Sequence, residues 1–277
     1  MSAHPCYRHP AKAAAVVCAR CDRPICTDCM APAPVGWQCP ECVRQGSRTV
    51  RPFSSTSARA AVGTNPTPVV IGIIAANVAC FVASGFGSTS AVSRFADQPI
   101  DIHYFHQYYR LFTAMFLHAN PLHIVSNMIA LLIIGPAVEV MLGKGRFLAL
   151  YLVAGLGGST CSYLLSPSTE FGIGASGAIF GVMGAYVVLA RRRHVPMGPV
   201  VALIVINLAI GFTGNIDWRA HIGGLAVGAT LALAYDAASR LRSRALGPVL
   251  VAGSSVITLV VLALAVLLVA PGHLNLA

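Results

Sequence analysis

Charged side chains are scarce in this sequence of 277 residues. Asp, Glu, Lys and Arg make up 10% of the chain, hydrophobic residues make up 56%, and the mean hydropathy is +0.72. A typical soluble domain has about 25% charged residues. The composition therefore excludes an ordinary soluble globule and predicts a protein embedded in a lipid bilayer.

Acidic residues are scarcer than basic ones, with 9 Asp and Glu against 19 Lys and Arg and a formal net charge of +10. Such an excess can bind nucleic acid, but here the basic residues lie in short groups between apolar runs. The N-terminal 43 residues also lack a basic stripe with stacking aromatic residues. Charge in this pattern is typical of a membrane protein whose topology it sets. We therefore expect no nucleic-acid partner.

Cysteine is rare after residue 42, because only Cys80 and Cys161 lie beyond that point. The other seven cysteines are in the first 42 residues and mark a separate N-terminal region. The first 30 residues also lack the apolar run of a signal peptide. We therefore expect the N-terminus to stay in the cytoplasm.

Seven apolar segments follow this region, and several approach the roughly 20 residues that cross a bilayer as a helix. They cover residues 68–86, 122–142, 147–165, 176–190, 197–212, 220–238 and 248–270. The fourth and fifth are shorter, so each either sinks only partly into the bilayer or extends into its flanks. The sequence predicts an all-α polytopic membrane protein. Residues 44–67, rich in Arg, Ser, Thr and Pro, are expected to form a flexible linker.

The distribution of basic residues predicts the topology. With the N-terminus in the cytoplasm, 16 of the 19 Lys and Arg fall on the cytoplasmic side, and only Arg94, Arg110 and Arg219 fall outside. Seven spans then place the C-terminus outside. A six-span count would disturb the asymmetry little, so the last span depends mainly on its own apolar run. The absent signal peptide and the residue usage favour a bacterial plasma membrane.

The N-terminal region contains four pairs of metal-ligand residues, each with two residues between the partners. The pairs are Cys6 with His9, Cys18 with Cys21, Cys26 with Cys29, and Cys39 with Cys42. This spacing lets both side chains bind one tetrahedral zinc, so we predict two zinc ions. A disulfide scaffold is the alternative, but it requires an oxidising compartment.

The N-terminal region, residues 1–43, resembles the B-box type of small zinc-binding domain. That resemblance implies an interleaved arrangement, with one zinc held by Cys6, His9, Cys26 and Cys29 and the other by Cys18, Cys21, Cys39 and Cys42. The spacing by itself leaves consecutive pairing open. Either arrangement fills every zinc position with a protein ligand, so the ions would be structural. We expect this domain to bind a cytoplasmic protein partner.

Several polar residues lie at membrane depth. A polar side chain inside a bilayer costs free energy, so each of these residues is a candidate for function. His123 and Asn127 are one helical turn apart, with His118 expected above them at the membrane surface. An interhelical hydrogen bond is the alternative for such a histidine. Glu139 lies near the cytoplasmic end of its span, where we expect it to hold backbone by hydrogen bonds.

A glycine-rich segment, residues 172–177, leads into the fourth span, with Ser176 at its start. Taken alone, this serine could simply cap the helix. His221 stands at the start of the sixth span, whose Gly224 and Gly228 form a small-residue face like that of the Ser176 helix. Close approach of the two helices could bring the imidazole within reach of the hydroxyl, as activation of a serine requires. An ordinary packing motif is the alternative.

Together, these residues resemble the rhomboid family of intramembrane serine proteases over residues 68 to about 238. Four motifs occur in the family's order: Tyr109-Arg110, where the family usually has Trp before the Arg; His118, His123 and Asn127; Gly174-Ala175-Ser176-Gly177; and Ala220-His221 with Gly224 and Gly228. The resemblance implies a six-helix catalytic core, residues 68–240. The rest of the chain, residues 241–277, would add one C-terminal transmembrane helix.

The resemblance also implies roles for individual residues. Ser176 would be the nucleophile and His221 the general base, in a dyad without a carboxylate and without a catalytic cofactor. His123 and Asn127 would stabilise the oxyanion, and Phe180 would pack on His221 or else face lipid. The implied substrates are single-pass transmembrane proteins. A non-catalytic pseudoprotease or adaptor is the alternative function, although this chain keeps both the serine and the histidine.

Overall fold

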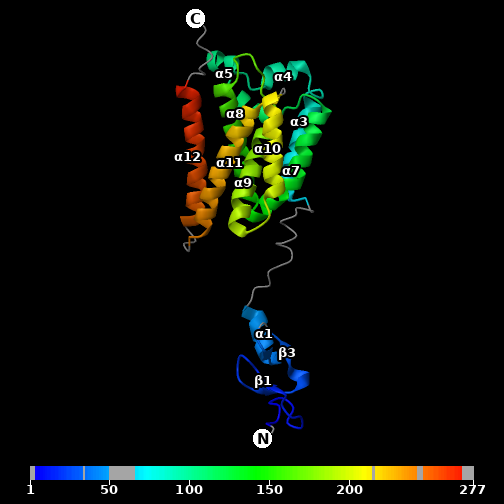
Figure 1. Ribbon diagram of the computed structural model, residues 1–277. Helices are drawn as coiled ribbons and strands as arrows, with labels where there is room; N and C mark the ends of the chain where they lie inside the picture. Colours follow the sequence, from blue (N-terminus) through cyan, green and yellow to red (C-terminus); the bar gives the residue numbers. More distant parts are fainter. Residues whose placement is uncertain (1–3, 34, 50–65, 214–215, 242–245, 270–277) are drawn as a thin grey trace. The chain divides into compact units, whose positions relative to one another are not determined.

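The computed structural model describes residues 4–33, 35–49, 66–213, 216–241 and 246–269 (Figure 1). The chain divides into two compact units, Met1–Ala58 and Arg59–Ala277. The first unit contains the cysteine-rich region, and the second contains the apolar segments.

The N-terminal unit consists of two short hairpins and a helix. Its elements are β1 (Val16–Val17), β2 (Pro24–Ile25), η1 (Thr27–Cys29), β3 (Ala31–Pro32), β4 (Trp37–Gln38) and α1 (Pro40–Thr49), with β1 antiparallel to β2 and β3 antiparallel to β4. Two-residue strands bury little apolar surface, and the core accordingly consists of six cysteines and Ile25. Cross-links or metal, rather than apolar packing, must stabilise such a unit.

The predicted end of this unit at residue 43 falls inside α1, which continues to Thr49. Pro40 at the first helical position and Glu41 in the first turn both favour a helix start here. The predicted linker, residues 44–67, is therefore helical in its first part. Its residues 50–65 lie outside the described residues.

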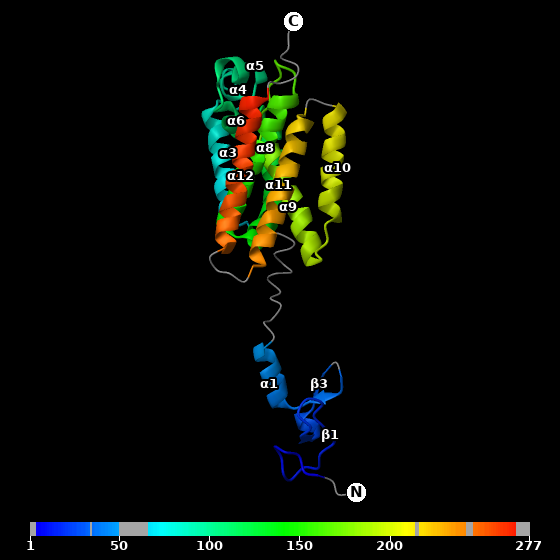
Figure 2. The same ribbon diagram turned by 90° about the vertical axis from the view of Figure 1, so that its left-hand side faces the viewer.

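The second unit has one long helix for each of the seven predicted apolar segments (Figures 1 and 2). These are α3 (Pro68–Ala83), α7 (Pro121–Leu142), α8 (Lys144–Leu165), α9 (Ser176–Arg193), α10 (Gly198–Thr213), α11 (Trp218–Ser239) and α12 (Leu246–Leu268). Of these, α7, α8, α11 and α12 are long and apolar enough to cross a membrane, and α3 and α10 are shorter apolar helices. The predicted all-α polytopic membrane fold is confirmed.

The loop between α3 and α7 is itself mostly helical. It contains α4 (Thr89–Phe95), α5 (Pro99–Phe105), α6 (Arg110–Thr113) and η2 (Ala114–Phe116). Within the bundle, α9 packs against α7, α8 and α11, whereas α12 lies at an edge in Figure 1 and α10 lies at an edge in Figure 2. Helix α9 therefore sits at the centre of the bundle.

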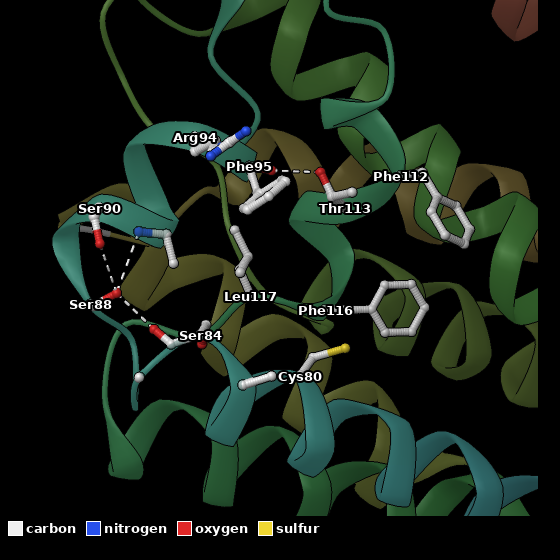
Figure 3. Close-up of a pocket in the computed structure, with 13 residues that line it drawn as sticks. Cys80, Ser84, Ser88, Ser90, Arg94, Phe95, Phe112, Thr113, Phe116 and Leu117 are labelled. Atoms are coloured by element: carbon white, nitrogen blue, oxygen red, sulfur yellow. Dashed lines mark hydrogen bonds between the residues drawn. The ribbon is translucent and has the colours of Figure 1, made fainter.

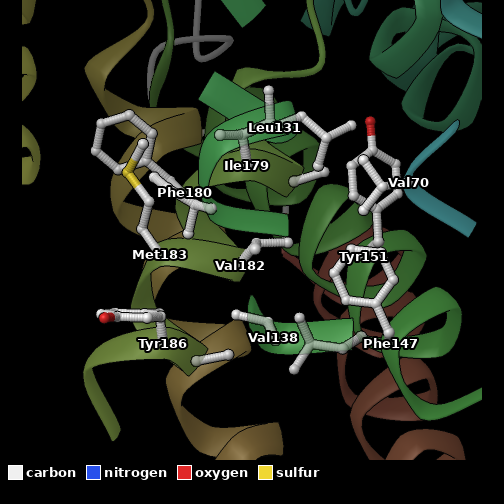
Figure 4. Close-up of a cluster of buried hydrophobic side chains, with 14 of the residues drawn as sticks. Val70, Leu131, Val138, Phe147, Tyr151, Ile179, Phe180, Val182, Met183 and Tyr186 are labelled. Carbon is white, nitrogen blue, oxygen red and sulfur yellow. The ribbon is translucent and has the colours of Figure 1, made fainter. Parts of the chain in front are cut away.

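A large apolar cluster joins α3, α7, α8 and α9 around Phe147 and Tyr151, which are both fully buried (Figure 4). Val70 from α3 and Leu131 from α7 pack beside them. Lipid is as apolar as these side chains, so close packing rather than the hydrophobic effect holds the helices together.

The closest helix contact is between α9 and α11, where glycines of one helix meet carbonyl groups of the other. A Cβ atom added at Gly224 would lie 1.9 Å from the Gly177 oxygen, and one at Gly228 would lie 2.1 Å from the Gly181 oxygen. Only glycine fits these positions of α11. The small-residue faces of the two helices thus pack directly on each other.

Basic residues gather at one end of the bundle. The Arg193 guanidinium at the end of α9 donates to the Met141 carbonyl of α7 at 3.3 Å. Arg192 and Arg240 both pair with Asp236 of α11, at 3.7 Å and 3.0 Å. Since Arg193 ends α9 and Ser176 begins it, Ser176 lies at the opposite end of the bundle.

Glu139 holds the start of α3 at this basic end. Its carboxylate accepts hydrogen bonds from the backbone N–H groups of Val69 at 3.3 Å and Val70 at 3.0 Å, and from the Thr67 hydroxyl. These donors belong to the unpaired first turn of a helix. The contact is structural, of the kind expected from the sequence.

Replacing Gly224 by Ala should destabilise the protein, because the added carbon must push α9 and α11 apart. Overpacking of this kind costs about 1–3 kcal/mol. Thermal unfolding of the purified protein in detergent measures the effect. Gly253→Ala in α12 is the matched control, since nothing lies within 4 Å of its added carbon. Equal melting temperatures for the two variants would contradict the close contact.

Candidate active site

A cavity of about 520 Å³ opens where α9 begins. Its wall includes eight polar residues from the outer loop and from α7, α8, α9 and the start of α11: Asp97, Asn120, His123, Ser126, Ser159, Ser162, Ser176 and Asp217. Three of the predicted site residues, Ser176, His123 and Gly174, therefore share one cavity.

A larger cavity of about 710 Å³ lies between α3, α4, α6 and η2 (Figure 3). Its hydroxyl groups are engaged within the wall, since Ser88 donates to the Ser84 carbonyl at 2.7 Å and Thr113 donates to the Phe95 carbonyl at 2.7 Å. None of the predicted catalytic residues lines it. The chemistry of the sequence motifs therefore belongs to the smaller cavity.

Ser176 is the first residue of α9 and is half-buried in the cavity wall. The helix is capped by Ala175, and no side-chain capping bond is made there. The alternative that Ser176 simply caps the helix is therefore wrong. The backbone N–H groups of this first turn are the ones that a helix leaves unpaired, so they are available to an anion beside the hydroxyl.

His221 of α11 stacks on Phe180 of α9, with ring centroids 4.0 Å apart and planes inclined by 7°. Both side chains are 3% exposed, which excludes a lipid-facing Phe180. Phe180 is one turn after Ser176 and so shares its face of the helix. Neither ring nitrogen of His221 has a hydrogen-bond partner among the described residues. The imidazole thus lies against the α9 face that begins with Ser176, with both nitrogens unpartnered among the described residues.

Gly174 brings the α7 polar residues to the loop that leads into Ser176. At its φ of +119° a Cβ atom would lie 2.8 Å from His123 Nε2 and 3.9 Å from Asn127 Nδ2. One Asn127 amide hydrogen is donated to the His123 carbonyl at 3.0 Å, which leaves the second available. The structure therefore brings His123 and Asn127 together at this loop.

His118 lies in the loop before α7 and is buried by the protein itself. Its side chain is 0% exposed, and its ring meets the His123 ring edge-on at 5.0 Å. The backbone of the outer loop at Gly87 lies directly against the His118 carbonyl. Burial and the neighbouring His123 lower the pKa of His118 to about 4, so its ring is neutral at pH 7.

Arg110 holds the outer loop together from a buried position. Its guanidinium pairs with Asp101 Oδ2 at 2.7 Å and donates to Gln107 Oε1 at 2.7 Å, to the Ser93 carbonyl at 2.9 Å and to the Ala96 carbonyl at 3.0 Å. Every contact is within the loop, so Arg110 acts by fixing α4, α5 and α6 beside the cavity.

Two aspartates of the cavity escaped the sequence analysis. Asp217 caps α11, since its carboxylate accepts from the N–H groups of Arg219 at 3.2 Å and Ala220 at 3.1 Å and from the Ser162 hydroxyl. An Asp directly before an apolar helix is a recognisable capping signal. Asp97 carries no such signal, because it is a single acid within a loop.

Asp97 is 2% exposed, and neither carboxyl oxygen has a hydrogen-bond partner among the described residues. Its burial and the nearby Asp217 carboxylate raise the pKa of Asp97 well above its usual range, against a smaller opposing effect of Arg110. The group therefore resists ionisation in the folded protein.

The N-terminal unit brings its eight metal-ligand residues into two groups, Cys6, His9, Cys26 and Cys29, and Cys18, Cys21, Cys39 and Cys42. Within each group the ligand atoms lie within 4.8 Å of one another. This is the interleaved arrangement, so consecutive pairing is wrong. None of the nine cysteines forms a disulfide in this structure. Each group could hold a metal ion.

Comparison with known proteins supports the rhomboid family. Residues 106–238 match the Rhomboid domain family. The chain is 43% identical over 152 residues to "Rhomboid protease GluP" of Bacillus subtilis, 34% over 137 residues to "RHOMBOID-like protein 1" of Arabidopsis thaliana, and 32% over 151 residues to "Rhomboid protease AarA" of Providencia stuartii. These matches cover 52%, 47% and 44% of this chain. They span only 30%, 35% and 54% of the relatives.

Replacing Asp97 by Asn should stabilise the protein, and more strongly at pH 8 than at pH 5. A carboxyl whose pKa is raised by folding contributes stability below its unfolded pKa, and this contribution is lost as the pH rises through the folded value. The amide has nearly the same shape and no charge to bury. The measurement is the difference in melting temperature between variant and wild type in detergent at both pH values.

The control for this variant is Glu170→Gln, because the Glu170 side chain is 56% exposed and pairs with Arg219 outside the cavity wall. It should shift the melting temperature little at either pH. A shift for Asp97→Asn that is the same at pH 5 and pH 8 would contradict the raised pKa.

Proposed function

We propose that this chain is an intramembrane serine protease of the rhomboid family that cleaves single-pass transmembrane proteins with a dyad of Ser176 and His221. The main support is the stacking of His221 on Phe180, at 4.0 Å between ring centroids. It holds an imidazole with two free nitrogens on the helix face that begins with Ser176. The match of residues 106–238 to the Rhomboid domain family adds to this support.

In the proposed reaction, His221 takes the Ser176 proton while the Ser176 oxygen attacks the scissile carbonyl carbon. The tetrahedral intermediate then breaks its C–N bond, and His221 returns the proton to the leaving amine. A water molecule repeats the two steps on the acyl-enzyme and releases the carboxyl product. The cavity supplies a route for that water into the bundle.

The developing negative oxygen needs hydrogen-bond donors. We assign these to the His123 ring, the free amide hydrogen of Asn127 and the backbone N–H of Ser176. Their common location at the Gly174 loop supports the assignment. One such donor is typically worth about 10²–10³ in rate.

In the N-terminal unit, we propose one structural zinc ion in each group of ligands. Four thiols, or three thiols and an imidazole, match the ligand sets of tetrahedral structural zinc. With all four positions filled, the ions would supply stability and no reaction step. The unit would then serve as a binding domain for a cytoplasmic protein.

The basic end of the bundle supports a proposal for the topology. We propose that this end faces the cytoplasm of a bacterium, with the N-terminus on the same side and the C-terminus outside. The substrate would then meet Ser176 from the outer half of the membrane, where the cavity opens.

One observation favours a second candidate, a non-catalytic membrane adaptor that presents the N-terminal unit. The His221 nitrogens have no hydrogen bond with Ser176 in this conformation. A direct test of serine reactivity separates the two candidates.

Wild-type protein in detergent should be labelled covalently by a fluorophosphonate probe. Ser176→Ala should abolish labelling, and His221→Ala should slow it by about 10²-fold or more, because the serine loses its general base. Ser126→Ala is the control, since this hydroxyl lines the same cavity and should leave labelling intact. Folded wild-type protein that is neither labelled nor able to cut a transmembrane substrate would establish the adaptor instead.

The purified full-length protein should contain two zinc ions per chain, as measured by inductively coupled plasma mass spectrometry. Replacing Cys18 and Cys21 together by Ser should reduce the content to one, because these residues belong to a single ligand group. Replacing Cys80 and Cys161 by Ser should leave it at two. A preparation without zinc, or a double variant that keeps both ions, would refute the assignment.

A further inference from the structure

Asp97 is a buried acid that the proposed reaction does not use. Asp97 belongs to the wall of the Ser176 cavity, and its two buried carboxyl oxygens lack a partner among the described residues. Burying a carboxyl without a hydrogen bond is costly, and native structures rarely tolerate it without a reason. A hydrogen-bond donor that enters the cavity would supply the missing partner.

The backbone fixes Asp97 beside the segment that leads to the nucleophile. Its N–H donates to the Gly172 carbonyl at 3.0 Å, and the Gly172 N–H donates back at 2.8 Å. Gly172 is four residues before Ser176 in the loop that leads into α9. The position of Asp97 is therefore set by the loop that carries the serine.

Three polar side chains converge on Gly172. A Cβ atom there would lie 3.0 Å from Ser162 Oγ, 3.2 Å from Asp217 Oδ2 and 3.3 Å from the Asp97 Cβ. Gly172 therefore lies close against both aspartates and Ser162, and all four residues line the same cavity. Asp217 is already hydrogen-bonded by Ser162 and by its own helix, whereas Asp97 is not.

This part of the cavity lacks positive charge. Among the residues that line the cavity, Asp97 and Asp217 are the carboxyl groups, and His123 is the single basic side chain. The guanidinium of Arg110 lies nearby, but it is paired with Asp101 and makes no bond to Asp97 among the described residues. A cation is therefore the kind of group that the two carboxyl groups would bind in this part of the cavity.

We propose that Asp97 and Asp217 form a subsite of the Ser176 cavity that receives a basic side chain, Lys or Arg, from a substrate residue beside the cleaved bond. This inference rests on the proposed proteolytic function. The entering ammonium or guanidinium donates hydrogen bonds to the Asp97 carboxylate, and the Asp97 proton passes to water. Such charge-assisted bonds are about twice as strong as neutral ones.

The same exchange suits a substrate that comes from lipid. A Lys or Arg near the outer end of a transmembrane segment is expensive in the bilayer. Transfer of its charged end to a pair of carboxyl groups inside the protein removes that cost. The subsite would therefore select segments that carry a basic residue at the depth of Ser176.

The test uses the full-length protein in liposomes and a single-pass substrate that it cleaves. The two substrate residues before the cleaved bond and the two after it are changed one at a time, either to Lys or to Met. Met has a similar length and no charge. In the wild type, at one of these positions, kcat/KM for the Lys substrate should exceed that for the Met substrate by about tenfold or more.

Asp97→Asn should reduce this ratio to about one, and Asp97→Glu should retain part of it. The ratio is internal to each variant, so a general loss of turnover does not affect it. Size-exclusion chromatography and thermal unfolding establish that each variant is folded. The matched control is Glu170→Gln, an exposed acid outside the cavity wall, which should keep the wild-type ratio.

A wild-type protein without a Lys preference at any of the four positions, or an Asp97→Asn variant that keeps it, would overturn the subsite. Failure of the proteolytic function gives a different result, since neither substrate is then cut and Ser176 takes up no fluorophosphonate. That result would remove the subsite together with the reaction.

Discussion

The contact between α9 and α11 is the constraint on which the rest of the membrane unit depends. Glycines of α11 lie against carbonyl groups of α9, so the two backbones touch without side chains between them. Lipid offers little hydrophobic drive for helix association, and close backbone approach is the stronger alternative. It also puts the two residues of the proposed dyad, Ser176 and His221, on facing helices. The Phe180 ring, one turn after Ser176, stacks on His221 there.

Around this pair, polar groups are distributed unequally between the two ends of the bundle. At the end with Arg193 and Asp236, ion pairs and a hydrogen bond join neighbouring helices. The other end carries a cavity whose hydroxyl, imidazole and carboxyl groups are only partly satisfied. Unsatisfied groups cost stability, and they are also the groups that can exchange protons or bind a substrate. The packed end and the contact between α9 and α11 stabilise the fold while the cavity end remains open to chemistry.

Much of this architecture is predictable from the sequence, because hydropathy determines helices and glycine spacing determines close approach. The seven long helices and the α9–α11 face were predicted in this way. The grouping of the cysteine pairs followed only from the resemblance to the B-box type of zinc-binding domain, since identical spacings are compatible with either arrangement. The burial of His118 and the orphaned Asp97 were also beyond reach, because both depend on how the outer loop folds over the bundle. Apolar periodicity carries no information on such a loop.

The N-terminal unit has a core made almost entirely of sulfur. Strands of two residues and one fully buried isoleucine bury too little apolar surface to offset the entropy of ordering the chain. With metal bound, the free energy of coordination becomes the free energy of folding. The folded fraction of this unit would then follow the availability of the metal, so the cell's zinc supply would decide how many copies display the unit in its folded shape.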